Sequence, residues 1–341
     1  MHAAGQGPRN LITDVAGLRV GQAEDEAART GVTVILADGR AVCACDVRGG
    51  APGTRETDAL APENLVDAAD AVVLAGGSVY GLAAADGVTS VLGAAGSGYR
   101  LATTGGAPPS PIVPAAILYD LANGGEKGWG EAPPYRDLGM AATRSAGDRF
   151  ALGTAGAGVG AMAGRLKGGL GSASVVSADG FTVGAIAAVN SYGSVVAPGG
   201  RTFWSAPYEL DGEFGVLGSA GLVAAPDDWG LAKGVPAAGR TNTTIACVAV
   251  DAALTPSECK RLAIMAQDGL ARAIRPAHAP FDGDVVFALA TGKREIEAPR
   301  LLTVARLGAL AADTLARAIA RGVFEATAWA GTGVTCWRDL R

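Results

Sequence analysis

The chain has 341 residues, a net charge of −5 and a sequence pI near 5.2, so it lacks the basic face of a typical nucleic-acid-binding protein. Apolar residues make up 49% of it, which excludes a disordered protein. No apolar run reaches the roughly 18 residues of a transmembrane helix, and the first residues show no secretion signal. We therefore expect a cytoplasmic protein that binds neither nucleic acid nor membrane.

The histidine and cysteine content narrows the chemistry. Only His2 and His278 are present, which excludes a zinc site built from several histidines and leaves His278 alone for a Ser-His-Asp triad. The five cysteines follow no disulfide or zinc-binding spacing, and we expect reduced core residues. We expect no metal and no cofactor, so a hydrolytic reaction needs another base.

Alternating apolar residues predict a β-hairpin early in the chain, with Asp38-Gly39 as its turn. Gly76-Gly77-Ser78 predicts a turn from a buried strand into a helix. The elements expected in this part are strands at 11–20, 31–37 and 41–46, a short helix at 62–69, a strand at 71–75, a helix at 79–93 and weaker patterns at 118–123 and 138–142.

The residue pattern in the second half of the sequence predicts a hairpin, a long irregular segment and then regular structure. From residue 195 to 240 the pattern disappears, and a loop of that length indicates function or processing. Thr255-Pro256-Ser257-Glu258 predicts a capping box with proline at the first helical position. The expected elements are strands at 172–177, 182–189, 244–250 and 285–290 and helices at 255–274 and 302–324, a pattern typical of an α+β or layered α/β fold.

The junction Asn242-Thr243 lies where the irregular segment meets a buried strand. A threonine hydroxyl there can attack a carbonyl, and breaking the preceding peptide bond would give Thr243 an α-amine with a pKa near 8. That amine can replace the missing histidine as the base. An ordinary entry into a strand is the alternative interpretation of this junction.

Other polar residues stand at the ends of predicted elements. Asp282 and Asp284 flank one glycine before a strand, where two carboxylates can orient an amine or move a proton; a solvated turn is the alternative, and calcium binding is a lesser one. Asn190 ends a strand, where its amide could bind an oxyanion or cap a turn. Residues 156–164 are glycine-rich without a preceding strand, which favours close packing over a nucleotide site and places Lys167 just beyond it.

Taken together, these segments resemble the self-cleaving family of L-aminopeptidase/D-esterases, β-peptidyl aminopeptidases and nylon-oligomer hydrolases. The resembling segments run in the family's order from residue 13 to residue 292: TDVAGLRVG, DVRGGAPGTRETD, LAGGSVYGL, AAILYDL, GAGVGAMAGRLKGGLGS, AAVNSYG, RTNTTI and PFDGDVVFALATG. One such segment is weak evidence, whereas eight in order are specific.

The resemblance implies an α/β fold, a four-layer αββα sandwich of the N-terminal nucleophile type. It also implies a single hydrolase domain that cleaves itself into an α chain, 1–242, and a β chain, 243–341. Thr243 would be the nucleophile and Asp282 and Asp284 the acidic pair of the threonine-dependent nylon-hydrolase branch. Asn190 and Tyr119 would hold the oxyanion, and the substrate loop would contain Gly76, Gly77, Ser78 and Tyr80.

The resemblance leaves the lysine position open. The nylon-hydrolase pattern puts a lysine where this chain has Arg165, and the aminopeptidase pattern matches Lys167. Arginine does not readily release a proton, so we assign the role to Lys167.

The expected activity is hydrolysis of short peptides or nylon-like 6-aminohexanoate amides through an acyl-enzyme. A β-peptidyl or L-aminopeptidase is the first alternative, and a self-cleaving N-acyl transferase of the ornithine acetyltransferase type shares the architecture but not the motifs. An uncleaved structural or small-molecule-binding protein is the alternative from another class. We expect the two fragments to stay associated and to form a homo-oligomer, a tetramer of αβ units.

Overall fold

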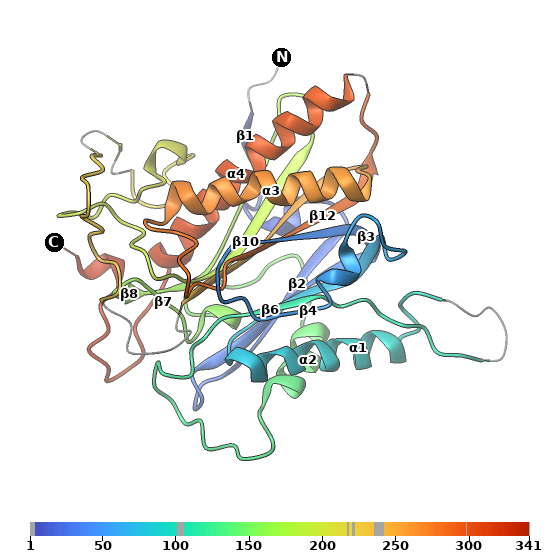
Figure 1. Cartoon of the computed structure of the whole chain (residues 1–341), viewed down its shortest axis with the longest axis horizontal. Helices are drawn as coiled ribbons and strands as arrows, with labels where there is room; N and C mark the ends of the chain where they lie inside the picture. The colour runs from blue at the N-terminus through green and yellow to red at the C-terminus, as the bar shows by residue number, and fades with distance from the viewer. Residues whose placement is uncertain are drawn as a thin grey trace.

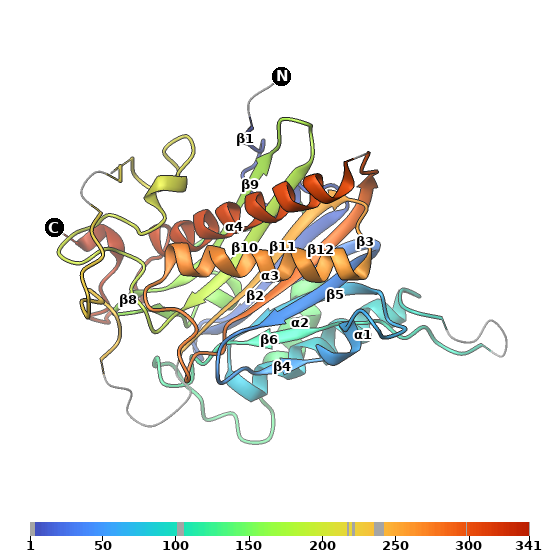
Figure 2. The same ribbon diagram turned by 45° about the horizontal axis from the view of Figure 1, so that its top comes forward.

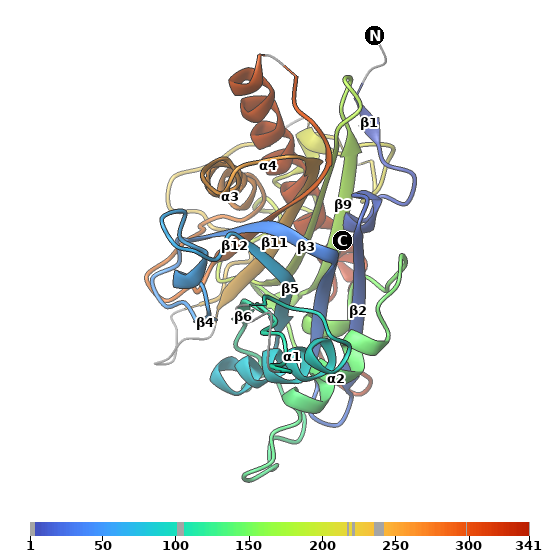
Figure 3. The same ribbon diagram turned by 90° about the vertical axis from the view of Figure 1, so that its right-hand side faces the viewer.

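The computed structural model is of the uncut chain. It describes residues 4–100, 106–216, 218–219, 222–234, 242–297 and 299–340. Two pairs of helices enclose strands that lie between them (Figures 1 and 3). The helices are α1 (Ala84–Ala94), α2 (Tyr135–Arg144), α3 (Pro256–Ala273) and α4 (Arg300–Phe324), with short 3-10 turns at Ile12–Asp14, Asp58–Leu60, Ser78–Ala83, Gly156–Gly158, Ala206–Tyr208 and Trp337–Asp339.

Within the described residues, ten strands join in one hydrogen-bonded sheet and two form a small separate ribbon. The order along the large sheet is β1-β9-β10-β11-β12-β3-β5-β6-β4, with β2 also paired to β3. The strands are β1 (Gly5–Gln6), β2 (Leu18–Asp25), β3 (Thr30–Val47), β4 (Thr54–Arg55), β5 (Ala68–Ala75), β6 (Ala115–Ile117), β7 (Met162–Ala163), β8 (Leu166–Lys167), β9 (Gly169–Val176), β10 (Thr182–Asn190), β11 (Thr243–Ala252) and β12 (Val285–Arg294).

Three apolar clusters divide this structure into four layers. The first cluster lies between α3 and α4 and the strands β9 to β12, the arrangement seen in Figure 2. The second lies between the two halves of the folded sheet, and the third lies between β3, β5 and β6 and the helices α1 and α2. The layers are therefore helices, strands, strands and helices, so the expected αββα sandwich is confirmed.

The strand β11 is buried on both faces. Ala246, Val248 and Val250 point into the first cluster, whereas Ile245 and Cys247 point into the second. Because side chains alternate between the faces of a strand, such a strand can only be internal. It lies between β10 and β12, as expected of a central strand.

Most elements with a strong pattern are confirmed. The hairpin of β9 and β10 forms with the predicted turn, and β12, α3 and α4 cover the expected segments. Thr255 caps α3, since its hydroxyl accepts the Glu258 N–H at 3.3 Å while the Glu258 carboxylate accepts the Thr255 N–H at 2.8 Å. The described part of the segment 195–240 is irregular apart from one short 3-10 turn, Ala206–Tyr208.

The hairpin predicted at Asp38-Gly39 is wrong, because β3 continues through it as one strand. Residues on its first half pair with β2, and those on its second half pair with β12. The register with β5 shifts between Leu36 and Ala41, and Gly39 has a φ of 85°. A bulge needs the same turn-forming residues as a hairpin, and here it lets one strand pass from one sheet layer to the other.

Three other predictions need correction. The helix expected at 62–69 is wrong: the segment is a turn followed by β5, whose Ala69 lies in the core between strands. The strand expected at 11–20 starts later, at Leu18, because Ile12–Asp14 forms a 3-10 turn instead. The helix expected at 79–93 begins as the 3-10 turn Ser78–Ala83 and becomes α-helical at Ala84.

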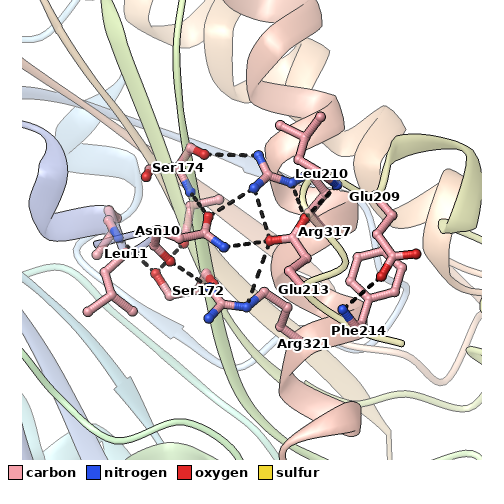
Figure 4. Close-up of polar contacts among 12 residues, drawn as sticks. Asn10, Leu11, Ser172, Ser174, Glu209, Leu210, Glu213, Phe214, Arg317 and Arg321 are labelled. Atoms are coloured by element: carbon pink, nitrogen blue, oxygen red, sulfur yellow. Dashed lines mark hydrogen bonds and ion pairs between the residues drawn. The ribbon is translucent and has the colours of Figure 1, made fainter. Parts of the chain in front are cut away.

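A buried polar cluster connects segments on both sides of residue 243 (Figure 4). Arg317 of α4 donates to Glu213 Oε2, to the Asn10 side chain and to the Ser174 carbonyl, each at 2.9 Å. Asn10 in turn donates to Glu213 at 2.6 Å. Arg321 lies beside the same glutamate, with 3.8 Å between Nε and Oε2. Glu213 and Arg317 are almost fully buried, so α4 is joined firmly to the preceding segments.

Candidate active site

Thr243 is the first residue of β11 and lies at the end of the central strand. Its register partner in β10 is Asn190, the last residue of that strand. Thr243 is only 4% exposed and Asn242 only 1% exposed. In the continuous chain the Asn242–Thr243 peptide bond is therefore shielded from water.

Two groups contact the carbonyl oxygen of Asn242. The Thr243 hydroxyl donates a hydrogen bond to it, and the Gly283 N–H donates to it at 3.1 Å. A Cβ at position 283 would lie 2.6 Å from Thr243 Oγ1, closer than atoms can approach. The nucleophile, the peptide carbonyl and a backbone donor thus meet at one point, and only glycine fits beside them.

The acidic pair lies on either side of Gly283, and both carboxyls are buried. Asp284 accepts the Thr244 N–H at 2.8 Å with one oxygen, and with the other it accepts the His278 N–H at 3.0 Å and contacts His278 Nδ1 at 2.9 Å. Asp282 accepts the Ala279 N–H at 2.9 Å. Burial and the neighbouring Asp284 charge raise the pKa of Asp282 above its usual range. Asp284 therefore fixes the strand entry, while Asp282 can hold a proton.

The glycines of the DVRGGAPGTRETD segment allow a close approach to this acidic turn. A Cβ at Gly49 would lie 2.3 Å from the Asp284 nitrogen, and one at Gly50 would lie 2.5 Å from the Pro280 carbonyl. The adjoining Ala51 N–H donates to the Asp282 carbonyl at 2.7 Å. The motif thus serves as backbone packing that holds the acidic pair in place.

Asn190 is fully buried and connects three segments of the site. Its Oδ1 accepts the Met162 N–H at 2.9 Å, and its Nδ2 donates to the Tyr119 carbonyl at 3.0 Å. The group of Tyr119 that contacts Asn190 is the backbone carbonyl. The expected neighbours Asn190, Tyr119 and Thr243 are therefore close together.

The expected substrate loop adjoins the Tyr119 segment. The Gly77 N–H donates to Asp120 Oδ1 at 2.7 Å, and the Ser78 N–H donates to the Leu118 carbonyl at 2.9 Å. Gly77 has a φ of 84°, and a Cβ there would lie 2.0 Å from the Tyr135 ring, so this residue must be glycine. Gly76 precedes it against the Asp120 carboxylate.

Tyr80 lies at the outer side of the same loop. It is 46% exposed and packs edge-on against Trp129 at 5.9 Å between ring centroids. This position suits contact with a bound molecule rather than with the reacting atoms.

Lys167 is caged by backbone carbonyls. Its Nζ donates to Gly158, Ala161 and Gly168 at 3.1, 3.0 and 2.7 Å, and it stands 4.7 Å from the centre of the Trp329 ring. Burial lowers the pKa of Lys167 to about 7. The contacts place it behind the turn that precedes Met162, the residue bonded to Asn190, so Lys167 supports the site from behind.

Arg165 is exposed and points to a different segment. It donates to the Gly230 carbonyl at 3.0 Å, and its own N–H donates to the Leu231 carbonyl at 2.8 Å. These contacts hold the stretch that leads to Lys233, whose N–H donates to the Tyr192 carbonyl at 2.9 Å. Neither candidate for the lysine position thus contacts the Thr243 side chain.

Sequence reasoning missed three residues of the site. Lys233 lies in the irregular segment, where no periodic pattern marks a partly buried side chain, and its Nζ stands 3.4 Å from the Asn190 carbonyl oxygen. Gly283 was noted only as a spacer. His278 could have been found, since it is one of only two histidines and stands six residues before Asp284.

Among the residues that the structure describes, no group of three or more His, Cys, Asp or Glu side chains is arranged to hold a metal ion. In the same residues, no helix is both long enough and apolar enough to cross a membrane. All five cysteines are buried and unpaired. The chemistry available at Thr243 is therefore that of a hydroxyl, two carboxyls, amides and a nearby ammonium group.

Comparison of the fold defines the class of protein. The structure is similar to that of the L-aminopeptidase D-Ala-esterase/amidase from Ochrobactrum anthropi, with a TM-score of 0.69 and 20% identity over 98% of this chain and 91% of that one. That protein is described as a variant of the Ntn hydrolase fold. The present chain thus has the architecture of N-terminal nucleophile hydrolases.

The sequence then gives the family: the chain belongs to Peptidase family S58, whose profile matches residues 10–336. It is 47% identical to an uncharacterized aminopeptidase of Mycobacterium tuberculosis, over 97% of this chain and 98% of the relative. It is 30% identical to the 6-aminohexanoate-oligomer endohydrolase of Kocuria sp. strain KY2, over 86% of this chain and 78% of that protein. The protein is an amide-bond hydrolase of the aminopeptidase type.

Proposed function

We propose that this hydrolase matures by cutting itself between Asn242 and Thr243 and then uses Thr243 as an N-terminal nucleophile. The observation that carries the proposal is the contact between the Thr243 hydroxyl and the carbonyl of its own preceding peptide bond. That carbonyl also receives the Gly283 N–H, a donor that can stabilise an oxyanion. Membership of a peptidase family supports this hydrolytic role over a structural or binding role.

Maturation would convert a shielded peptide bond into a catalytic site. Attack by Thr243 Oγ on the Asn242 carbonyl carbon gives an ester, and water hydrolyses it. Thr243 then carries a free α-amine, which can take the proton from its own hydroxyl during attack on a substrate amide. Because Thr243 is 4% exposed before cleavage, maturation must also make Thr243 accessible to a substrate.

In the mature enzyme, the residues around Thr243 would divide the work. The α-amine is the base, the Asn190 amide and the Tyr119 hydroxyl stabilise the oxyanion, and Asp282 and Asp284 hold the amine and move protons. Lys167 acts through the turn at Gly158 to Ala161 that it holds. An acyl-enzyme on Thr243 is released by water.

Short peptides or oligoamides are the substrates that we propose. Support for 6-aminohexanoate amides comes from the name of the Kocuria relative, and support for an aminopeptidase comes from the name of the mycobacterial relative. The Gly76–Tyr80 loop would contact them. A screen of short α-peptides, β-peptides and 6-aminohexanoate oligomers separates these substrates, and cleavage of none of them would contradict the proposal.

We also propose that the two fragments stay together after cleavage. The cluster of Glu213, Asn10 and Arg317 connects the part before the cut to α4, and β11 lies between β10 and β12. We extend the proposal to a tetramer of αβ units in the cytoplasm, where five unpaired cysteines stay reduced. Light scattering of the mature protein tests the assembly, and a mass near that of one 33.8 kDa unit would contradict it.

The test of self-cleavage is the mass of the purified chain. We expect two fragments that correspond to residues 1–242 and 243–341. Replacing Thr243→Val removes the hydroxyl while keeping the shape, so this variant should remain uncut and inactive.

Thr244→Val is the matched control. Thr244 is the next residue of β11, is fully buried, and has no hydrogen-bond partner for its hydroxyl among the described residues. This variant should still be cut. A wild-type chain of full mass, a cut at another bond, or maturation of the Thr243→Val variant would each contradict the proposal.

A further inference from the structure

The uncut chain lacks a catalytic group that the mature enzyme has, the free α-amine of Thr243. Before the cut, the Thr243 nitrogen belongs to an amide, so it cannot act as a base. It is also the leaving group of the reaction, and an amine leaves a tetrahedral intermediate only when a proton reaches it. The continuous chain therefore needs both a proton acceptor for the hydroxyl and a proton donor for the nitrogen.

The strand geometry shows what lies next to the Thr243 nitrogen. Neighbouring residues of a strand direct their N–H groups to opposite sides. The Thr244 N–H points to Asp284 on the β12 side, so the Thr243 N–H is directed toward β10, where Asn190 is its register partner. A proton donor beside the Asn190 backbone is therefore also close to the Thr243 nitrogen.

Lys233 stands at that place. Its Nζ lies 3.4 Å from the Asn190 carbonyl oxygen, and its own backbone N–H is bonded to Tyr192, two residues beyond Asn190. The Asp282 carboxyl interacts electrostatically with this ammonium group. Behind Asp282 the charged or titratable groups are Asp284 and its partner His278.

We propose that Lys233 is the general acid of self-cleavage, which gives its proton to the Thr243 nitrogen as the Asn242–Thr243 bond breaks. The role rests on the self-cleavage proposed above and adds to it a residue from the irregular segment. It concerns the maturation step, because in the mature enzyme the Thr243 α-amine is already free.

The steps balance with Asp282 as the first proton acceptor. Thr243 Oγ bonds to the Asn242 carbonyl carbon, its proton passes to the Asp282 carboxylate, and the carbonyl oxygen takes the electron pair beside the Gly283 N–H. When the carbonyl re-forms, the electrons of the C–N bond go to nitrogen, which takes the proton of the Lys233 ammonium. Asp282 then returns its proton to the Lys233 amine, and water hydrolyses the ester.

The acidity of the two groups suits this exchange. Burial lowers the pKa of Lys233 to about 7, and burial together with Asp284 raises the pKa of Asp282. Both the donor and the acceptor forms are then populated near neutral pH, where proton transfer between matched groups is fastest.

The experiment follows fragment formation over time in newly synthesised protein, by intact mass. Lys233→Met should slow it by about 100-fold, the size typical of one lost acid–base group. Lys233→Arg should be slow as well, because guanidinium keeps the charge but does not release a proton. For the wild type the rate should fall above pH 7 as Lys233 loses its proton, and this fall should be absent in Lys233→Met.

Lys260→Met is the matched control, since the Lys260 ammonium also contacts one backbone carbonyl and one aspartate, but on α3 away from Thr243. It should be cut at the wild-type rate. Propylammonium added to Lys233→Ala should restore cleavage, which an unfolded protein would not show. Absence of this rescue would contradict the role of Lys233.

The outcomes separate the two proposals. If the wild type is cut and Lys233→Met is cut equally fast, Lys233 is not the acid and the self-cleavage proposal stands. If Lys233→Arg is cut at the wild-type rate, only the charge matters and the general-acid role is wrong. If the wild type itself stays uncut, both proposals fail.

Discussion

The surroundings of Lys167 and of Lys233 make an instructive comparison. Lys167 is fully buried and Lys233 is partly buried, and burial lowers the pKa of each to about 7. Lys167 is held by three carbonyls and the Trp329 ring, in a rigid glycine-rich turn. Among the described residues, Lys233 Nζ has one carbonyl contact, at the longer distance of 3.4 Å, and it interacts with the Asp282 carboxyl.

The difference shows that a lowered pKa alone does not assign a role. A lysine whose donors are all engaged fixes backbone groups, and moving its proton would disrupt three contacts at once. A lysine with one long contact can release its proton at little cost. We therefore assign the supporting role to Lys167 and propose the reacting role for Lys233 from their contacts rather than from acidity.

Apart from substitution of Thr243 itself, the substitution that should lower the activity most is Lys167→Ala. Loss of the ammonium leaves the carbonyls of Gly158, Ala161 and Gly168 without their donor and loosens the turn that positions Asn190. We expect the activity of the mature enzyme to fall by about 100-fold, as for one lost oxyanion or acid–base group. Steady-state kinetics of cleaved enzyme measures this, and near-normal activity would remove Lys167 from the site.

A smaller effect concerns the pH dependence of stability. Between the folded pKa of Lys167, about 7, and its ordinary value near 10.5, the unfolded chain binds a proton that the folded chain does not. The free energy of unfolding should therefore rise with pH in this range, by about 2 kcal/mol per lysine between pH 7 and 9.

Urea unfolding of the uncut Thr243→Val protein tests this slope. Adding Lys167→Met or Lys233→Met should each remove part of the rise between pH 7 and 9. If the slope persists in both double variants, folding does not lower the pKa of either lysine and the prediction is wrong.

The smallest effect should come from Arg165→Ala. The side chain is exposed and, within the part of the chain that the structure describes, makes one hydrogen bond, to the Gly230 carbonyl, while the backbone bond to Leu231 remains. We expect activity within about two-fold of wild type and a stability change below about 0.5 kcal/mol. An effect larger than that of Lys167→Ala would show that the nylon-hydrolase pattern locates the important cation here.

The fold was predictable where one residue pattern permits only one structure. Residues 244–250 of β11 are all apolar or β-branched, and Thr255 to Glu258 form a capping box that only a helix uses. The bulge at Asp38-Gly39 was not predictable, because a bulge and a hairpin turn use the same residues. Only the pairing of β3 with β2, β5 and β12 separates the two.

The candidate site was predictable in part. Thr243, Asn190, Asp282 and Asp284 stand at the ends of predicted strands, so pairing brings them together. His278 and Gly283 stand near the acidic pair in the sequence, but their contacts depend on a tight turn. Lys233 carried no signal at all, because burial within an irregular segment leaves no periodic trace.

By itself, the sequence determined the family, the layered architecture and the threonine at the head of the central strand, because these depend on local patterns and ordered motifs. Only the tertiary structure decided which lysine lies beside the Asn190 carbonyl, opposite Thr243, and which one supports the backbone behind the site. Both are lysines near glycines, and their sequences do not distinguish them. The distinction depends on which carbonyls and carboxyls distant segments bring to each ammonium group.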